Sequence, residues 1–496
     1  MTRKQKLILN TSSSLLNQVI TVICGIILPR AYISAFGSDV NGLVASITQF
    51  VSIISFLQLG VGSVVQSSLY GPLAKNDKQG ISAIVVSSNR FFRKIAIALI
   101  FYAFVLLFAY PNIINTSYPF LFTGSLILII TISSFAQYFF GITYQLLLNS
   151  DQLAYITLLT NAGTTILNTI LVLILIQFDA SIQLVKFLST VVFLIRPMVY
   201  QLVVRQRYSL DLDMKLTTEP IAQKWNGIAQ HIASVVLTST DIIVLTLFSS
   251  LSIVSVYSVY YYVVHGIRQI VVATTAGVKS LFGNMLYNNE IPKLNQVFEK
   301  YEWMMHTFTV LIFTITGVLL VPFIKVYTVG ISDYNYIYPA FGVLLTLAQG
   351  VYCLRLPYNQ IVLAAGHFKQ TQSSAIIEAS LNICISVGLV ISYGLIGVAI
   401  GTLVAMTYRT IYLAWYLSHN ILKRKFRYFV FHSCVDIVSV FVMVFLCQWI
   451  ELVQNTFFAW FVMAIKVSLL CLGGALISNL IFYPQLVFSM QQGIRR

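Results

Sequence analysis

Nine basic residues in this chain stand inside long apolar stretches, where a charge costs ~2.5–3.5 kcal/mol at the centre of a membrane-spanning helix. Three of the nine, Lys186, Lys279 and Lys325, lie near helix ends and can extend to the membrane surface, which leaves six. They are Arg30, Arg196, Arg268, Arg355, Arg409 and Lys466. Arg30 is near the end of its stretch, so its side chain could reach the membrane surface. The others must pair or line a polar cavity. Because a guanidinium donates parallel hydrogen bonds that fit phosphate oxygens, we expect these arginines to bind an anionic group.

Acidic residues inside the apolar stretches are fewer than the cations. They are Asp241, Glu378 and Asp436. Asp241 and Glu378 are candidates either for charge pairing with the arginines or for coupling to an ion gradient. Pairing would explain individual arginines, but three acids cannot neutralise the whole set. The excess of positive charge favours an anionic ligand.

No pattern in the chain indicates a metal site, a nucleotide-binding loop or a nucleophile–base pair. Four histidines lie in separate apolar stretches without metal-ligand spacing: His231, His265, His306 and His432. The six cysteines all lie in apolar segments without a CxxC spacing, which is typical of free, buried thiols. We therefore expect no metal, no cofactor and no enzymatic activity.

The composition indicates that lipid is the solvent for most of the chain. Of its 496 residues, 58% are hydrophobic and 9% charged, with a mean hydropathy of +0.85. A soluble domain carries about 25% charged residues. The net charge of +15 would suggest nucleic acid in a soluble protein, but cationic loops beside a membrane explain it better. We expect no nucleic-acid partner.

The elements that must position the charged residues are helices of about 20 mostly apolar residues. The sequence predicts an all-α polytopic membrane protein with about fourteen such helices. The predicted spans are Leu7–Ile33, Val40–Leu69, Phe91–Tyr110, Pro119–Leu148, Leu153–Phe178, Ile182–Val204, Trp225–Phe248, Ile253–Phe282, Trp303–Tyr327, Tyr336–Leu363, Gln370–Ile391, Leu395–Leu417, Tyr428–Trp449 and Phe457–Phe482.

The loops between these spans alternate in charge, which predicts their orientation. Lys and Arg gather in every second loop, including those around Lys75–Lys78, Arg205–Lys224 and Lys423–Arg427. The opposite loops hold acids such as Asp39 and Asp179, but no Lys or Arg. The positive-inside rule then places both termini in the cytoplasm. An even number of spans is consistent with that placement.

An internal repeat is indicated by polar residues at a nearly constant offset. Asn168 and Asn382 differ by 382 − 168 = 214, as do Tyr144 and Tyr358, while Arg196 and Arg409 differ by 409 − 196 = 213. Repeats of this kind are common in transporters. We expect two six-helix bundles, residues 1–210 and 211–420, followed by two additional transmembrane helices in residues 421–496.

Two segments resemble polysaccharide and O-antigen repeat-unit flippases of the multidrug/oligosaccharidyl-lipid/polysaccharide (MOP) exporter superfamily. Residues 28–65, LPRAYISAFGSDVNGLVASITQFVSIISFLQLGVGSVV, resemble the first two helices of these proteins. Residues 240–269, TDIIVLTLFSSLSIVSVYSVYYYVVHGIRQ, resemble the start of their second half. The resemblance implies alternating-access translocation of an undecaprenyl-diphosphate-linked oligosaccharide across the bilayer of the bacterial cytoplasmic membrane.

The resemblance also implies a cationic central cavity and membership of a surface-polysaccharide pathway, including contact with polysaccharide polymerase machinery. The candidates for binding the diphosphate and sugar are Arg30, Arg196, Arg268, Arg355 and Arg409. Two functions of the same superfamily remain open. One is a peptidoglycan lipid-precursor flippase, and the other is a multidrug antiporter, although cationic drugs would favour an acidic cavity. A glycosyltransferase or polymerase is disfavoured because the outer loops are short.

Overall fold

A computed structural model describes residues 3–114, 118–214, 220–221, 228–275 and 278–486, and these are helical apart from short connections. Eleven of the described helices are long and apolar enough to cross a membrane. The predicted class, an all-α polytopic membrane protein, is confirmed. The chain forms two compact units, Met1–Ser255 and Val256–Arg496. The predicted boundaries at residues 210 and 420 stay a prediction.

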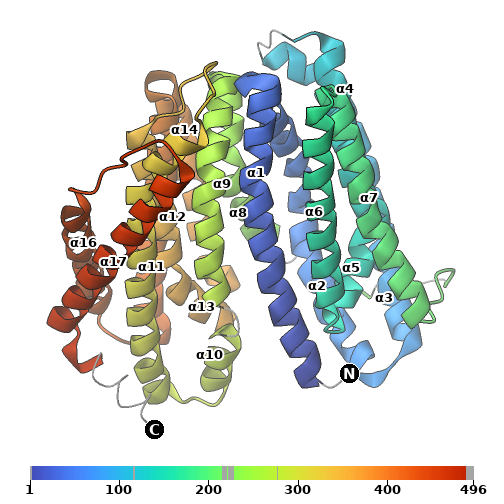
Figure 1. The fold of residues 1–496 in the computed structure, drawn as a ribbon. Coiled ribbons are helices and arrows are strands. Elements are labelled where there is room, and N and C mark those ends of the chain that lie inside the picture. The colour runs from blue at the N-terminus through green and yellow to red at the C-terminus, as the bar shows by residue number, and fades with distance from the viewer. Residues whose placement is uncertain (1–2, 115–117, 215–219, 222–227, 276–277, 487–496) are drawn as a thin grey trace. The chain divides into compact units, whose positions relative to one another are not determined.

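The first unit is a bundle whose core lies where its helices touch, around fully buried residues such as Leu43 and Ile47. α1 packs along α6, and α6 and α4 both pack along α7 (Figure 1). Its elements are α1 (Arg3–Ser52), η1 (Ile53–Ser55), α2 (Phe56–Lys75), α3 (Lys78–Ile113), α4 (Phe120–Ala136), the π-helical turn η2 (Gln137–Gly141), α5 (Ile142–Ser150), α6 (Ala154–Gln177), α7 (Ile182–Arg207) and α8 (Ile228–Phe248).

The second unit begins within α9 (Leu251–Thr274) and is organised around the long helix α11 (Ile291–Tyr327). α11 packs against α12 (Pro339–Leu354) and against the two C-terminal helices, α16 (Arg427–Cys447) and α17 (Phe457–Phe482). The remaining elements are α10 (Val278–Tyr287), α13 (Leu356–Ala364), α14 (Phe368–Tyr393), α15 (Leu395–Tyr416) and the π-helical turn η3 (Leu417–Ile421).

The eleven spans of the structure and the fourteen predicted ones differ at three places. Gly37 has φ 86° and ψ 167°, so it divides α1 into the two predicted helices that otherwise run together as one. The tyrosine-rich α9 is not among the eleven. The predicted span Trp225–Phe248 lies partly outside the described residues.

The internal repeat is visible in the bounds of the helices. α5 covers residues 142–150 and α13 covers 356–364, and both ends differ by 214 (356 − 142 and 364 − 150). α6 and α14 begin at residues 154 and 368, again 214 apart. In both halves, a helix is interrupted immediately before the short segment, at η2 in the first half and at Arg355 in the second.

α14 and α15 form a tight pair that depends on two small residues. A Cβ built on Gly401 would lie 2.3 Å from Ser386 Oγ, and one on Gly397 would lie 2.5 Å from the Leu389 carbonyl oxygen. This Gly-x-x-x-Gly spacing lets the helix backbones approach closely, as membrane helix pairs often do.

We expect Gly401→Val to lower the thermal unfolding temperature, because the two helices must separate to admit the side chain. Unfolding of the purified protein in detergent measures this. Gly388→Val, at a glycine of α14 with no atom within 4 Å of a built Cβ, is the control. Equal unfolding temperatures for both variants would contradict the close-packing argument.

Candidate functional site

Arg196 lies at the wall of a polar pocket of about 340 Å³ inside the first unit. Its Nε donates to Thr164 Oγ1 at 2.8 Å, and its Nη2 donates to Thr165 Oγ1 at 3.1 Å and to the Asn161 carbonyl at 3.5 Å. The guanidinium also stacks on Phe193, 4.4 Å from the ring centre. All of these partners are neutral, and no carboxylate of the described residues bonds to Arg196.

The other wall of this pocket comes from the interrupted helix between α4 and α5. Gln137, at the start of η2, donates through its amide to Gln145 Oε1 at 2.8 Å, and both residues line the pocket. π-helical turns are frequent at functional sites because the wider turn re-aims side chains. The pocket therefore presents amide and hydroxyl groups beside one guanidinium, which suits a phosphorylated or glycosylated ligand.

The second unit holds a buried ion triad around Glu378. The Glu378 side chain is fully buried; its Oε1 accepts from Arg355 Nη1 at 2.6 Å and its Oε2 accepts from Arg409 Nη1 at 2.6 Å. Glu378 therefore pairs with two arginines, which is one of the two roles that the sequence left open for it. One carboxylate shared by two guanidiniums leaves this triad with a net positive charge.

The triad and the pocket occupy corresponding places in the two halves. Thr164 and Glu378 differ by 378 − 164 = 214, and Gly141 and Arg355 differ by 355 − 141 = 214. The arginine of α7 therefore bonds to a threonine at the position where the arginine of α15 bonds to a glutamate. Glycine and threonine thus stand in the first half where arginine and glutamate stand in the second, and a Cβ built on Gly141 would lie only 2.7 Å from Gln137 Oε1.

Arg268 adds a further cation to the second unit. It is 8% exposed, donates from Nη1 to Gln349 Oε1 at 2.9 Å and lies 4.5 Å from the centre of the Tyr352 ring. Arg355 lies at the same distance from that ring. The guanidiniums of Arg268 and Arg355 thus flank one tyrosine ring, and Arg355 also belongs to the Glu378 triad.

The remaining candidates lie in the first unit. Arg30 is half-buried in α1, directly after Pro29. Asp241 is 3% exposed in α8. Neither lines the Arg196 pocket. Their proposed roles in binding and in ion coupling stay predictions.

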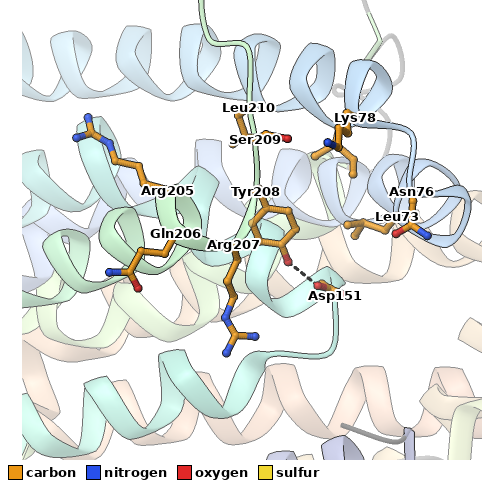
Figure 2. A pocket seen from close by; sticks show the side chains of 11 residues that line it. Leu73, Asn76, Lys78, Asp151, Arg205, Gln206, Arg207, Tyr208, Ser209 and Leu210 are labelled. Atoms are coloured by element: carbon orange, nitrogen blue, oxygen red, sulfur yellow. Dashed lines mark hydrogen bonds between the residues drawn. The ribbon is translucent and has the colours of Figure 1, made fainter.

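A second polar pocket of the first unit, about 650 Å³, lies where α2, α3, α5 and α7 begin or end (Figure 2). Its charged lining residues are Lys78, Asp151, Arg205 and Arg207. The Tyr208 hydroxyl donates to Asp151 Oδ2 at 2.5 Å. Burial, followed by this bond to the carboxylate, raises the pKa of Tyr208 above its ordinary value, so the phenol stays protonated.

The pocket of Figure 2 also tests the predicted arrangement of loops. Lys6 Nζ, near the N-terminus, donates to the Asp151 carbonyl at 3.0 Å. This pocket is lined by residues from three connections that were predicted to lie on the cationic side, around positions 76, 151 and 207. These connections therefore lie at one end of the first unit, as the charge pattern requires. The assignment of that end to the cytoplasm stays a prediction.

One sequence-based expectation about a basic residue is wrong, and the contacts of another basic residue were not predicted. Lys466 is exposed on α17 with no partner among the described residues, so it neither pairs nor lines a described pocket; its long stem can carry the ammonium toward the membrane surface. Arg424 lies in the connection between η3 and α16, as predicted, but its guanidinium donates from Nη1 and Nη2 to the buried Glu302. Glu302 itself was missed because α11 begins eleven residues before it (302 − 291), well ahead of the predicted span.

The Glu302 region is the main functional candidate that the sequence did not predict. The amphipathic stretch before Trp303 was the available signal, since Leu294 and Phe298 are one helical turn apart and both are fully buried. Among the described residues, no group of His, Cys, Asp and Glu is arranged to hold a metal ion.

No family model matches the sequence, and no curated protein matches it significantly. Solved structures do match. The lipid II flippase MurJ in an inward closed conformation superposes with a TM-score of 0.72 at 17% identity, covering 97% of this chain and 100% of MurJ. An inward-facing multidrug resistance MATE family transporter of the MOP superfamily matches with a TM-score of 0.63 at 15% identity, covering 83% of this chain and 99% of its own.

A mutant of the Vibrio cholerae MATE transporter VcmN is also similar, with a TM-score of 0.61 at 15% identity over 86% of this chain and 98% of that one. These likenesses define the class: the chain is a multi-pass membrane protein with the fold of MOP-superfamily transporters. At such identities they establish the fold, while the cargo has to be argued from the site.

Proposed function

We propose that this protein is a flippase that moves undecaprenyl-diphosphate-linked oligosaccharide repeat units across the bacterial cytoplasmic membrane, by alternating access, for surface polysaccharide biosynthesis. The observation that carries the proposal is Arg196, a guanidinium inside an apolar bundle whose partners are all neutral and which faces a polar pocket. A partly buried cation whose partners are neutral is stabilised when an anionic ligand approaches it.

The chemistry of the pocket supports a diphosphate attached to a sugar. Arg196 supplies the charge, while Gln137, Gln145 and Asn161 supply amide groups of the kind that hydrogen-bond to sugar hydroxyls. Its volume of about 340 Å³ falls at the lower end of the range for small-molecule sites. We propose that the pocket holds the headgroup and that the prenyl chain stays in lipid.

Arg30, Arg268, Arg355 and Arg409 keep their proposed roles in the passage of the cargo. Of these, Arg268 is the most suitable in the second unit because its described partner is an amide, not a carboxylate. Arg355 and Arg409 are held by Glu378, so they contribute a net positive potential instead of a free pair of N–H donors for the phosphate.

We expect Arg196→Gln to lower transport about ten- to hundredfold, the effect of losing a hydrogen bond to a charged group of roughly 1.5–3 kcal/mol. The measurement is translocation of a fluorescent undecaprenyl-diphosphate-linked glycan in proteoliposomes. Lys466→Gln is the matched control, since it removes a positive charge from an exposed side of a span. Transport by Arg196→Gln at the rate of that control would remove the proposed role of Arg196.

A second candidate is translocation of the lipid-linked peptidoglycan precursor, favoured by the likeness to the MurJ structure over nearly the whole chain. Complementation of a strain depleted of its lipid II flippase separates the two, because only the second candidate predicts growth. The likeness to MATE transporters also supports a multidrug antiporter as an alternative function. The Arg196 pocket disfavours it, because a cation would repel cationic drugs.

A further inference from the structure

A network of ionisable side chains is buried in the second unit, away from the Glu378 triad. It joins α11 to α13, to α16, to the segment after η3 and to the residue after α17. Its members are Glu302, His306, Tyr358, Arg424, His432, Asp436 and Tyr483. The function proposed above uses none of them.

Glu302 is the fixed anion of this network. Its side chain is fully buried, and its two oxygens accept from Arg424 Nη1 at 2.7 Å and Nη2 at 2.5 Å. This two-pronged contact keeps the carboxylate ionised, because a guanidinium does not release its protons. The Tyr358 hydroxyl donates to Glu302 Oε1 at 2.8 Å. The single hydroxyl proton of Tyr358 is therefore used in the bond to Glu302.

The direction of that bond determines the proton on His306. His306 Nε2 lies 2.8 Å from the Tyr358 oxygen, which has no proton left to donate in this direction, so Nε2 must carry a hydrogen. On the other side of the ring, His306 Nδ1 lies 2.6 Å from Asp436 Oδ2. A neutral ring protonated at Nε2 and an ionised carboxylate would bring two acceptors face to face. One additional proton must therefore lie between Nδ1 and Oδ2.

Counting the charges of the network also gives one additional proton. Glu302 and Asp436 carry two negative charges and Arg424 carries one positive charge, which leaves one negative charge in a buried site. A single proton on the His306–Asp436 pair neutralises it. A second proton, on His432, is disfavoured because the two imidazole rings are 5.2 Å apart. His432 instead contacts Tyr483 through Nδ1 at 2.6 Å and lies 3.7 Å from Glu302 through Nε2.

We propose that the His306–Asp436 pair is a reversible proton-binding site, whose ligand is a single proton, and that its occupancy controls the contact between α11 and α16. When the proton is present, imidazole and carboxylate bind each other and hold the two helices together. When it leaves, the lone pairs of Nδ1 and Oδ2 repel, and one unbalanced negative charge remains in the bundle. The helices then separate or admit water.

The site adds a driving ion to the proposed transport function without depending on the cargo. The titratable or charged groups that the described structure places around this pair belong to the network: Glu302 on α11, Tyr358 on α13, His432 on α16, Arg424 after η3 and Tyr483 after α17. Glu302 and Arg424 neutralise each other, and the tyrosine bond is satisfied. The pair between His306 and Asp436 is consequently the place where a proton is gained or lost.

The test is a pH jump on proteoliposomes adsorbed to a solid-supported membrane, in the absence of any cargo. The wild-type protein is expected to give a transient charge displacement as the proton binds. Asp436→Asn is expected to reduce this signal at least tenfold. An asparagine amide donates to Nδ1 with no extra proton, so the α11–α16 contact and the fold are kept. His306→Gln is expected to lose the signal as well.

His367→Gln is the matched control. This histidine of the second unit also contacts a tyrosine, Tyr416, at 3.0 Å, but it has no carboxylate partner within the part of the chain that the structure describes. Its variant should keep the displacement within twofold of wild type. An undiminished signal in Asp436→Asn overturns the proposal, whatever the outcome for His306→Gln. Because no cargo is present, failure of the flippase assay does not affect this result.

Discussion

Thr164→Glu is expected to reduce transport on the order of hundredfold while the protein stays folded. The substitution gives the first half the carboxylate that the second half has at the corresponding residue, Glu378. The new carboxylate would pair with Arg196, whose Nε already lies 2.8 Å from the threonine hydroxyl. An anionic ligand would then meet a neutralised guanidinium and a negative charge, which costs several kcal/mol at a buried site.

The Thr164 experiment separates charge from bulk by a neutral variant. Thr164→Gln adds a side chain of the same size without the charge, so it should reduce transport less than Thr164→Glu. Translocation of the diphosphate-linked glycan in proteoliposomes gives both rates. If the two variants transport equally, steric filling explains the loss and the proposed electrostatic role of the pocket is wrong.

Glu378→Gln is expected to produce the largest loss of stability, about 3–5 kcal/mol in the free energy of unfolding, as is typical when one partner of a buried ion pair is removed. Arg355 and Arg409 donate to its two oxygens at 2.6 Å each, and the Glu378 side chain is fully buried. After the substitution, two guanidiniums face each other across one neutral amide.

Chemical denaturation in detergent micelles measures this loss. The double variant Glu378→Gln with Arg409→Gln should recover part of the stability, because it removes one of the two uncompensated charges. A Glu378→Gln variant as stable as the wild type would show that the triad contributes little to folding. That outcome would also weaken the proposed contrast between the first half, where Arg196 bonds to neutral groups, and the second half, where arginines pair with Glu378.

Much of the helical framework could be predicted from the sequence, since helix length and charge segregation follow directly from the membrane. Lys6 and Asp151 are far apart in the chain, but the alternating loop charges predicted that they share one end of the first unit. The repeat was predictable from Asn168 and Asn382, because aligned polar residues stand out against an apolar background. The bounds of α5 and α13 confirm it.

The partners of the intramembrane charges could not be predicted in the same way. Spacing along the sequence places a residue at a depth but gives neither the rotation of its helix nor its neighbours. Thus Glu378 was recognised as a possible partner, but not its simultaneous bonds to Arg355 and Arg409. Similarly, the helix before Trp303 is too polar to be predicted as a span, which left Glu302 and its contact with Arg424 unseen.

The correspondence between Thr164 and Glu378 has a consequence for how the protein acquired its asymmetry. Two copies of one ancestral segment need not share a task. The copy that holds Glu378 supplies the counter-charge for its own arginines. The copy with Thr164 and Gly141 lacks that carboxylate, and the described partners of its arginine are neutral hydroxyl and carbonyl groups. With the proposed function, the two halves would divide the labour: one half balances its own charges, and the other receives its counter-charge from the cargo.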